Sequence, residues 1–212
     1  MRMLSCCPMR KAGTLPPGPA AAGDDLLDKR IQHRIQTIIR DSGIRPSRVL
    51  EVGGVVGPKS LLGFPELEQA ERYCLNLVNF PSDAGVTAMT GNANDMPMFG
   101  DASFDLVMSN ATLEHDRHFW LSISEMQRVT KPGGLLVIGV PGYVKGGDTG
   151  PGRDRGLRTV THRVHYRFDY YRFSEQAVRE VFFAGMDDVE VSAMLIPPRI
   201  IGHGRKPAKG SS

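Results

Sequence analysis

A carboxylate stands directly before a glycine-rich turn in the segment RVLEVGGVVG. Glu51 lies in an apolar run that is typical of a buried strand, and Gly53, Gly54 and Gly57 follow it. Such a turn lets a ligand approach bare backbone, and a carboxylate beside it attracts cationic groups. The dinucleotide pattern G-x-G-x-x-G does not fit, because Val55 occupies the place of its second glycine. The segment favours a ligand with a cationic group; the alternative is that Glu51 only braces the amides of the loop.

Histidine side chains are the candidates for a general base, the group that removes a proton from a hydroxyl nucleophile. His115 follows the apolar run FDLVMSN, within the sequence LEHD, while His162 and His165 lie in HRVH. We take His115 and His165 as the catalytic candidates. For His115 the alternative is a structural role, in which it caps the next helix or bonds a loop carbonyl. The sequence HRVH has no third ligand or acid at a suitable spacing, so we predict no metal site.

Six arginines and only two acids lie in residues 153–172. A guanidinium matches the two oxygens of a carboxylate or phosphate, so these arginines are candidates for binding an anionic part of a substrate. A solvated loop is the alternative. Aromatic residues are interleaved with the arginines, but the stretch is short and the net charge of the chain is only +3. We therefore expect no nucleic-acid partner.

Short apolar runs alternate with helices or long connections along most of the chain. The predicted strands cover residues 48–52, 72–78, 86–91, 104–110, 135–141 and, late in the chain, 189–196. The predicted helices cover residues 24–43, 118–130 and 174–185, and the sequence KPGG is expected to end the second one. This alternation predicts an α/β fold with a doubly wound, mostly parallel sheet. Ligands bind such sheets at the carboxyl ends of the strands, which is where the candidate residues fall.

One domain is expected, at residues 24–204, because 212 residues suffice for one α/β core and are few for two. Residues 1–23 are rich in Pro, Gly and Ala and are expected to be a disordered arm, with a flexible tail at 205–212. Residues 142–173 are expected to form a lid and substrate-side insertion. Its first part, 142–161, is glycine-rich and far longer than the roughly 2–6 residues of a usual α/β connection.

The composition excludes several other classes of protein. No apolar run reaches the roughly 18–20 residues that span a membrane, and the first residues lack the apolar core of a secretory signal. Three cysteines, Cys6, Cys7 and Cys74, cannot form a disulfide framework. We therefore expect a cytoplasmic protein with no membrane partner.

Two longer segments resemble a known family. GNANDMPMFGDASFDLVMSNATLEHD, followed by EMQRVTKPGGLLVIGVP, resembles the class I S-adenosylmethionine-dependent methyltransferases, in particular the group called methyltransferase type 11. The resemblance covers about residues 48–141, with the motifs in the same order. The later segment HYRFDYYRFSEQAVREVFFAGMDDVEV resembles a part of some of these enzymes that forms the substrate side of the pocket. The resemblance implies a Rossmann-like fold and S-adenosylmethionine as the cofactor.

The resemblance also implies a set of site residues. The strand-one motif and the end of strand four surround the methionine portion, strand two ends at the ribose, and the turn after strand three meets the adenine. The residues implied for the methionine portion are Glu51, Gly53, Gly54, Gly57, Asn110 and Ala111. Those implied for the ribose are Asn76 and Leu77, and those for the adenine are Asn92 and Ala93. The implied substrate-side residues are Tyr143, Tyr166, Asp169, Tyr170 and Arg172.

Three positions depart from the pattern of the family. Val55 replaces the middle glycine of the loop, and Asn76 and Asn92 replace the acids that usually bind the ribose and the adenine. An amide still offers an acceptor oxygen and a donor, but as a neutral partner. We expect methyl transfer to a small-molecule acceptor, possibly an anionic one, with oxygen favoured over nitrogen, by a monomer or homodimer. The alternative is a non-catalytic binding or scaffolding protein with a methyltransferase fold.

Overall fold

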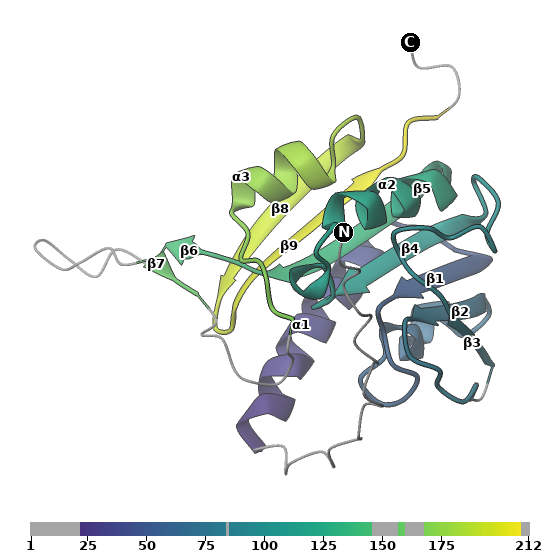
Figure 1. The fold of residues 1–212 in the computed structure, drawn as a ribbon, viewed down its shortest axis with the longest axis horizontal. Coiled ribbons are helices and arrows are strands. Elements are labelled where there is room, and N and C mark those ends of the chain that lie inside the picture. Colours follow the sequence, from purple (N-terminus) through teal and green to yellow (C-terminus); the bar gives the residue numbers. More distant parts are fainter. Residues whose placement is uncertain (1–21, 84, 146–156, 160–167, 209–212) are drawn as a thin grey trace, which may run out of the picture.

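The computed structural model describes residues 22–83, 85–145, 157–159 and 168–208. Its centre is a seven-stranded sheet in the order β3-β2-β1-β4-β5-β9-β8 (Figure 1). The strands are β1 Arg48–Val52, β2 Glu71–Asn76, β3 Val86–Thr90, β4 Phe104–Asn110, β5 Thr130–Pro141, β8 Asp187–Leu195 and β9 Pro198–Arg205. β1 to β5 run parallel, and β9 runs antiparallel to both of its neighbours. The predicted α/β class and the mostly parallel sheet are confirmed.

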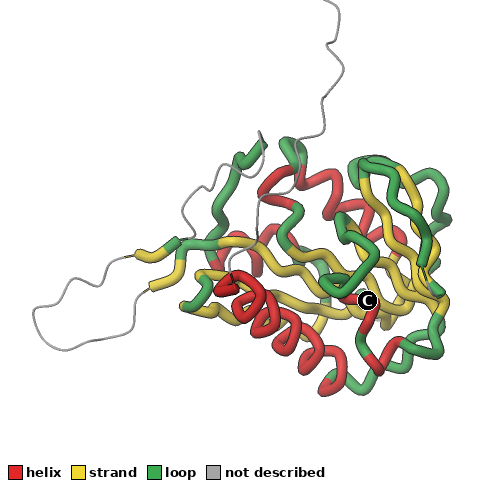
Figure 2. Tube along the Cα trace, turned by 90° about the horizontal axis from the view of Figure 1, so that it is seen from below, coloured by secondary structure: helices red, strands yellow, loops and turns green. Residues whose placement is uncertain are grey.

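Helices cover both faces of this sheet (Figure 2). They are α1 Ala22–Asp41, α2 Phe119–Val129 and α3 Glu175–Ala177, which continues into a π-helical turn, η4, at Val178–Phe182. Short 3-10 turns are η1 Leu61–Gly63, η2 Pro65–Leu67 and η3 Leu113–His115. A separate pair of two-residue strands, β6 Val144–Lys145 and β7 Leu157–Arg158, projects from the domain. Within the described residues, no helix is long and apolar enough to cross a membrane.

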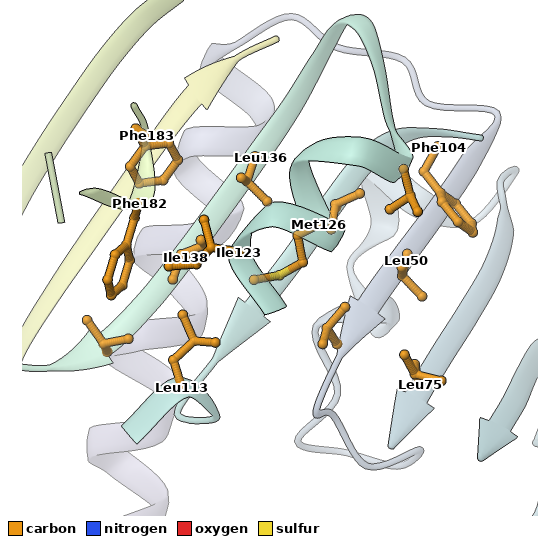
Figure 3. Packing of buried hydrophobic residues seen from close by; sticks show 14 of the residues in the cluster. Leu50, Leu75, Phe104, Leu113, Ile123, Met126, Leu136, Ile138, Phe182 and Phe183 are labelled. Carbon is orange, nitrogen blue, oxygen red and sulfur yellow. The ribbon is translucent and has the colours of Figure 1, made fainter. Parts of the chain in front are cut away.

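The alternation of side chains along the strands produces two apolar cores. Val49 packs in the core that α1 covers, whereas Leu50, one residue later, packs in the core on the opposite face. This second core includes Ile123 and Met126 of α2 together with Phe182 (Figure 3). Because successive residues of a strand point to opposite faces, a strand buried on both faces must be apolar almost throughout. Glu51 is the exception in β1.

The structure corrects the predicted start of the strand that ends at residue 141. The helix at 118–130 does end before KPGG, but these four residues lie within β5, which begins at Thr130 rather than at residue 135. The pairing of β4 with β5 shifts register here, since Phe104 pairs with Thr130 and Leu106 with Leu135. A bulge of this kind accommodates the proline and the two glycines without ending the strand.

The largest difference from the sequence prediction is β9, which the sequence did not reveal. Its two glycines suggest a loop, yet the strand fills the gap between β5 and β8. A β-carbon on Gly202 would lie 2.5 Å from the ring of Phe183 and 2.8 Å from Val178. The glycine is therefore required by the close packing of this strand on the last helical turn, not by a loop.

The polar tail also begins later than expected, because Arg205 is still part of β9 and Lys206 is fixed by hydrogen bonds. The ammonium group of Lys206 donates to the carbonyls of Gln127, Arg128 and Thr130 at 2.8, 3.1 and 2.8 Å. These carbonyls lie at the C-terminal end of α2, where helix carbonyls lack partners and the helix dipole favours a cation. Residues 209–212 of the expected tail, like residues 1–21 of the expected arm, lie outside the described residues.

Glu51 is buried in β1, with 3% of its surface exposed. Its carboxylate accepts hydrogen bonds from the Ser60 hydroxyl at 2.5 Å and from the Leu61 amide at 3.2 Å. Gly54 must be a glycine, because a β-carbon there would lie 2.3 Å from the Glu51 carboxyl carbon. Burial raises the pKa of Glu51, while the hydrogen bonds from Ser60 and Leu61 act in the opposite direction. These contacts of Glu51 fit the alternative left open by the sequence, in which this residue braces the loop that follows β1.

Replacing Lys206 by Met should lower the free energy of unfolding by about 1.5–3 kcal/mol, because three helix carbonyls lose a charged donor while the aliphatic stem is kept. Denaturant unfolding monitored by circular dichroism measures this. Lys206→Arg keeps a donor and should recover part of the loss. Equal stability of Lys206→Met and the unchanged protein would show that these contacts do not matter.

Replacing Glu51 by Gln should lower the free energy of unfolding by about 1–2 kcal/mol near pH 4.5, because the amide has one acceptor oxygen where Ser60 and Leu61 donate to two. A pKa that is raised on folding gives stability that is present below the unfolded value, about 4.5, and is lost as the pH rises through the folded value. The advantage over Glu51→Gln should therefore shrink as the pH rises above 4.5, as urea titrations can show. An advantage that grows with pH would contradict the effect of burial.

Candidate functional site

A cavity of about 650 Å³ opens at the carboxyl ends of the parallel strands. Its wall is built from the turns that follow β1, β2, β3 and β4, joined by the start of α2 and by residues before α3. The lining residues are Gly53, Leu75, Asn76, Leu77, Val78, Gly91, Asn92, Ala93, Asn94, Ala111, Thr112, His115, Asp116, Arg117, His118, Ser122, Phe168 and Tyr170. A smaller hollow of about 420 Å³ lies where β2 and β3 begin, away from these strand ends.

Six of the ten predicted cofactor residues line this cavity. They are Gly53, Asn76, Leu77, Asn92, Ala93 and Ala111. Glu51, Gly54, Gly57 and Asn110 do not, although each precedes or follows a lining residue closely in the chain. Glu51 lies beneath the glycine turn, and the side-chain oxygen of Asn110 is buried with no hydrogen-bond partner among the described residues. The sequence thus located turns that border the cavity but not, in every case, the residues that line it.

Two backbone positions give the floor of the cavity its shape. Gly53 has φ +79°, and a β-carbon there would lie 2.2 Å from the side chain of Thr112. Ala111 has φ +55°, a left-handed conformation that is uncommon for any residue other than glycine. Backbone strain of this kind is concentrated at functional sites, where the surrounding structure holds it. The two turns meet with almost no side chain between them.

Asn76 is committed to the glycine turn. Its amide nitrogen donates to the carbonyls of Gly53 and Gly54 at 3.3 and 2.7 Å, and its oxygen accepts from the amide of Val78 at 3.2 Å. An aspartate could not make the two donor contacts. Asparagine at residue 76 is therefore a structural requirement of this turn, and its predicted contact with a ribose stays a prediction.

The turn after β3 is closed by its own side chains. The oxygen of Asn92 accepts from the amide of Asn94 at 3.0 Å. The amide nitrogen of Asn94 donates to Asp116 at 2.7 Å and to Ser122 at 2.9 Å, and the Ser122 hydroxyl donates to Asp116 at 2.6 Å. Sequence reasoning missed Asn94 and Asp116, whose signal is the spacing of polar residues in GNAND and LEHD. They join the turn after β3 to the start of α2.

His115 lines the cavity, and its ring is held in place through Nδ1. Nδ1 lies 2.5 Å from the carbonyl oxygen of Phe168, and Nε2 lies 3.9 Å from a carboxylate oxygen of the buried Glu114. A carbonyl only accepts, so Nδ1 carries a hydrogen and the neutral ring has its lone pair on Nε2. The sequence's structural alternative, a bond to a loop carbonyl, is present together with a nitrogen that can act as a base.

The predicted substrate-side residues do not all lie at the cavity. Tyr170 lines the cavity beside Phe168, which the sequence did not single out. Asp169 and Arg172 form a buried ion pair with each other, and Tyr143 is exposed but does not line the cavity. His165 and Tyr166 lie outside the described residues, as do most of the predicted lid and its arginines.

Arg117 adds a positive charge to the wall of the cavity near Tyr170. Its guanidinium carbon lies 5.4 Å from the centre of the Tyr170 ring, and the rings of Phe168 and Tyr170 stack with their centres 6.1 Å apart. The exposed aromatic surface and the cation lie at the same end of the cavity as His115. Among the described residues, no group of three or more His, Cys, Asp or Glu side chains could hold a metal ion.

Comparison with known proteins agrees with this geometry. Residues 66–138 match the model of the methyltransferase domain family Methyltransf_11. The malonyl-[acyl-carrier protein] O-methyltransferase of Methylococcus capsulatus is 29% identical over 133 residues, which cover 57% of this chain and 48% of that protein. The chain thus spans about half the length of this curated relative.

Two solved structures share the fold over most of both chains. A chain of the complex between the Haloferax volcanii Trm112 methyltransferase activator and a methyltransferase superposes with TM-score 0.60 at 18% identity, covering 89% of this chain and 97% of that one. The Burkholderia thailandensis 1,6-didemethyltoxoflavin-N1-methyltransferase, solved with 1,6-didemethyltoxoflavin and S-adenosylhomocysteine, gives 0.58 at 17% identity, covering 91% and 93%. Together with the sheet order, these likenesses show that the chain has the fold of the class I S-adenosylmethionine-dependent methyltransferases.

Proposed function

We propose that this chain transfers a methyl group from S-adenosylmethionine to a small-molecule acceptor. The observation that carries the proposal is the cavity at the carboxyl ends of four parallel strands, with a bare glycine turn and a histidine in its wall. The cofactor supplies the activated methyl group, so the protein has to place the acceptor atom within about 3–3.5 Å and in line with the bond that breaks.

The described residues fit such a cofactor. The cradle at Gly53, which a β-carbon would fill, leaves room for a ligand against the backbone, and the strained Ala111 faces the same space. Asn76 and Asn92 line the middle of the cavity and would meet the ribose and the adenine. The site lacks carboxylates at both positions, so recognition depends on the enclosed shape and on neutral hydrogen bonds.

The acceptor end favours an anionic molecule whose nucleophile is a hydroxyl oxygen. Arg117 supplies a cation on the wall, and Phe168 and Tyr170 offer exposed rings against which an acceptor can pack. His115 lines the cavity and offers Nε2 as a candidate base, which a hydroxyl needs and an unprotonated amine does not. An oxygen acceptor therefore makes the fullest use of the residues present.

A second candidate function is a non-catalytic binding protein with the same fold. Its support is that the polar groups of Asn76, and the oxygen of Asn92, already bond within their own turns. Such a protein would keep the fold and the cavity but bind the cofactor weakly. The two predictions below separate it from the enzyme.

Isothermal titration should detect binding of both S-adenosylmethionine and S-adenosylhomocysteine. Gly53→Ala should weaken binding at least tenfold, because the new methyl group strains a left-handed residue and collides with Thr112. Gly63→Ala is the matched control, since a β-carbon there meets nothing within 4 Å. No heat of binding with either compound at millimolar concentration would contradict the proposed function.

Asn76→Asp should lower the free energy of unfolding by about 1–3 kcal/mol and should not tighten cofactor binding, because a carboxylate would face two carbonyl oxygens. Asn92→Asp is the control, because the side-chain oxygen that accepts from Asn94 is kept, and its stability should hardly change. Thermal melts and titration calorimetry measure both effects. Tighter binding and new turnover in Asn76→Asp would instead favour the non-catalytic protein.

A further inference from the structure

Glu114 is a buried carboxylate at the corner where the turn after β4 meets residues 168–171, which we call the acceptor wall. It lies in η3, directly before His115, with 3% of its surface exposed, and it does not line the cavity. Sequence reasoning gave it no role. An acid at a buried position costs stability unless it is compensated, so its surroundings are informative.

The backbone of this turn holds the acceptor wall in place. The carbonyl of Glu114 accepts from the amides of Tyr170 and Tyr171 at 2.8 and 3.3 Å. The next residue, His115, binds the carbonyl of Phe168 through Nδ1. Two successive residues of η3 therefore fix the segment that carries both aromatic rings of the wall. The position of the histidine ring and the position of the wall depend on the same turn.

The side chain of Glu114 faces a histidine on one side and an arginine on the other. One carboxylate oxygen, Oε1, lies 3.4 Å from Nη1 of Arg199 in β9 and 3.9 Å from Nε2 of His115. The second oxygen, Oε2, and Nε of Arg199 are buried without hydrogen-bond partners in the described part of the chain. Burial raises the pKa of Glu114, and the charges of Arg199 and His115 act against this. A buried ion pair with unpartnered atoms, such as Glu114 and Arg199, contributes little to stability. Its presence indicates a functional reason for keeping it.

The other titratable groups at this corner are engaged elsewhere. Asp169 pairs with Arg172, Asp116 accepts from Asn94 and Ser122, Arg117 lies over the ring of Tyr170, and His118 packs edge-on against Trp120. Among the described residues, Glu114 is the carboxylate that faces Nε2 of His115 within 4 Å. The charge on this nitrogen is therefore coupled to Glu114 more directly than to its neighbours.

We propose that Glu114 is a positioning residue that holds His115 ready to take a proton at Nε2 and stabilises the imidazolium that results. The inference rests on the proposed function. In transfer to a hydroxyl, the acceptor oxygen bonds to the methyl carbon, the carbon–sulfur bond breaks toward sulfur, and the hydroxyl proton goes to Nε2. Glu114 then faces a positive charge that was absent before the reaction, and Arg199 keeps its carboxylate in place. A base oriented by a third group is a recurrent arrangement in catalysis.

The test is the replacement Glu114→Gln, which keeps the shape and the backbone contacts and removes the charge. The histidine ring signals of the ligand-free protein are titrated by NMR between pH 5 and pH 9, with His115→Gln to assign the signal. We expect the midpoint for His115 to fall, because a carboxylate 3.9 Å from Nε2 is lost. Glu190→Gln is the matched control, since it removes an exposed carboxylate that faces His203, and should leave His115 unchanged.

Turnover gives a second readout. In Glu114→Gln, kcat should fall at least tenfold and the rising limb of its pH profile should move to lower pH, while the affinity for S-adenosylhomocysteine stays within about twofold. An unchanged His115 midpoint, or a loss of cofactor affinity that accounts for the loss of rate, would overturn the proposal. If Glu114→Gln does not fold, Glu114→Asp retains the charge at a greater distance and should shift the midpoint in the same direction by less. The NMR titration needs no turnover, so it decides the role of Glu114 even if the methyl transfer proposed above fails.

Discussion

The close approach of Gly53 to Thr112 is the constraint on which the site depends. The turns after β1 and β4 belong to neighbouring parallel strands, with Val52 paired to Ser109. The hydroxyls of Ser109 and Thr112 both donate to the carbonyl of Val52, at 3.0 and 3.4 Å. Since a β-carbon on Gly53 would collide with Thr112, the turns can be joined in this way only if one of them has no side chain. The floor of the cavity is consequently backbone, and the side chains that give it chemistry lie around its rim.

The rim is held together before any ligand arrives. Asn76 closes the glycine turn and Asn94 joins the turn after β3 to α2, while His115 binds the acceptor wall. A site whose loops are already fixed loses less conformational entropy when a ligand binds. The same hydrogen bonds also occupy groups that a ligand would otherwise use. The rim carries amides in place of carboxylates. Its polar contacts with a ligand are therefore weaker, but its shape is fixed.

Much of this organisation follows from local patterns in the sequence. The apolar run of β4 and the glycines after β1 locate turns that border the cavity, because strand period and turn chemistry act over a few residues. The sequence did not reveal β9, because Gly202 is explained only by its packing against Phe183. Phe183 is distant from Gly202 in the sequence, and the two residues are close only in the folded structure. The role of Asn76 as a brace and the pairing of Glu114 with Arg199 were missed for a similar reason. Both depend on partners that no local spacing reveals.

The position of β9 has a consequence for how the protein is made. This strand comes last in the sequence but lies inside the sheet, where it pairs Pro141 with Arg199 and Leu135 with Arg205. During synthesis the edge of β5 therefore stays unpaired until residues 198–205 have been made, and an unpaired edge is a template for association with other chains. Arg199, the partner of Glu114, lies on the same strand. The step that adds β9 to the sheet also completes the charged corner of the site, so a nascent chain has neither until β9 is in place.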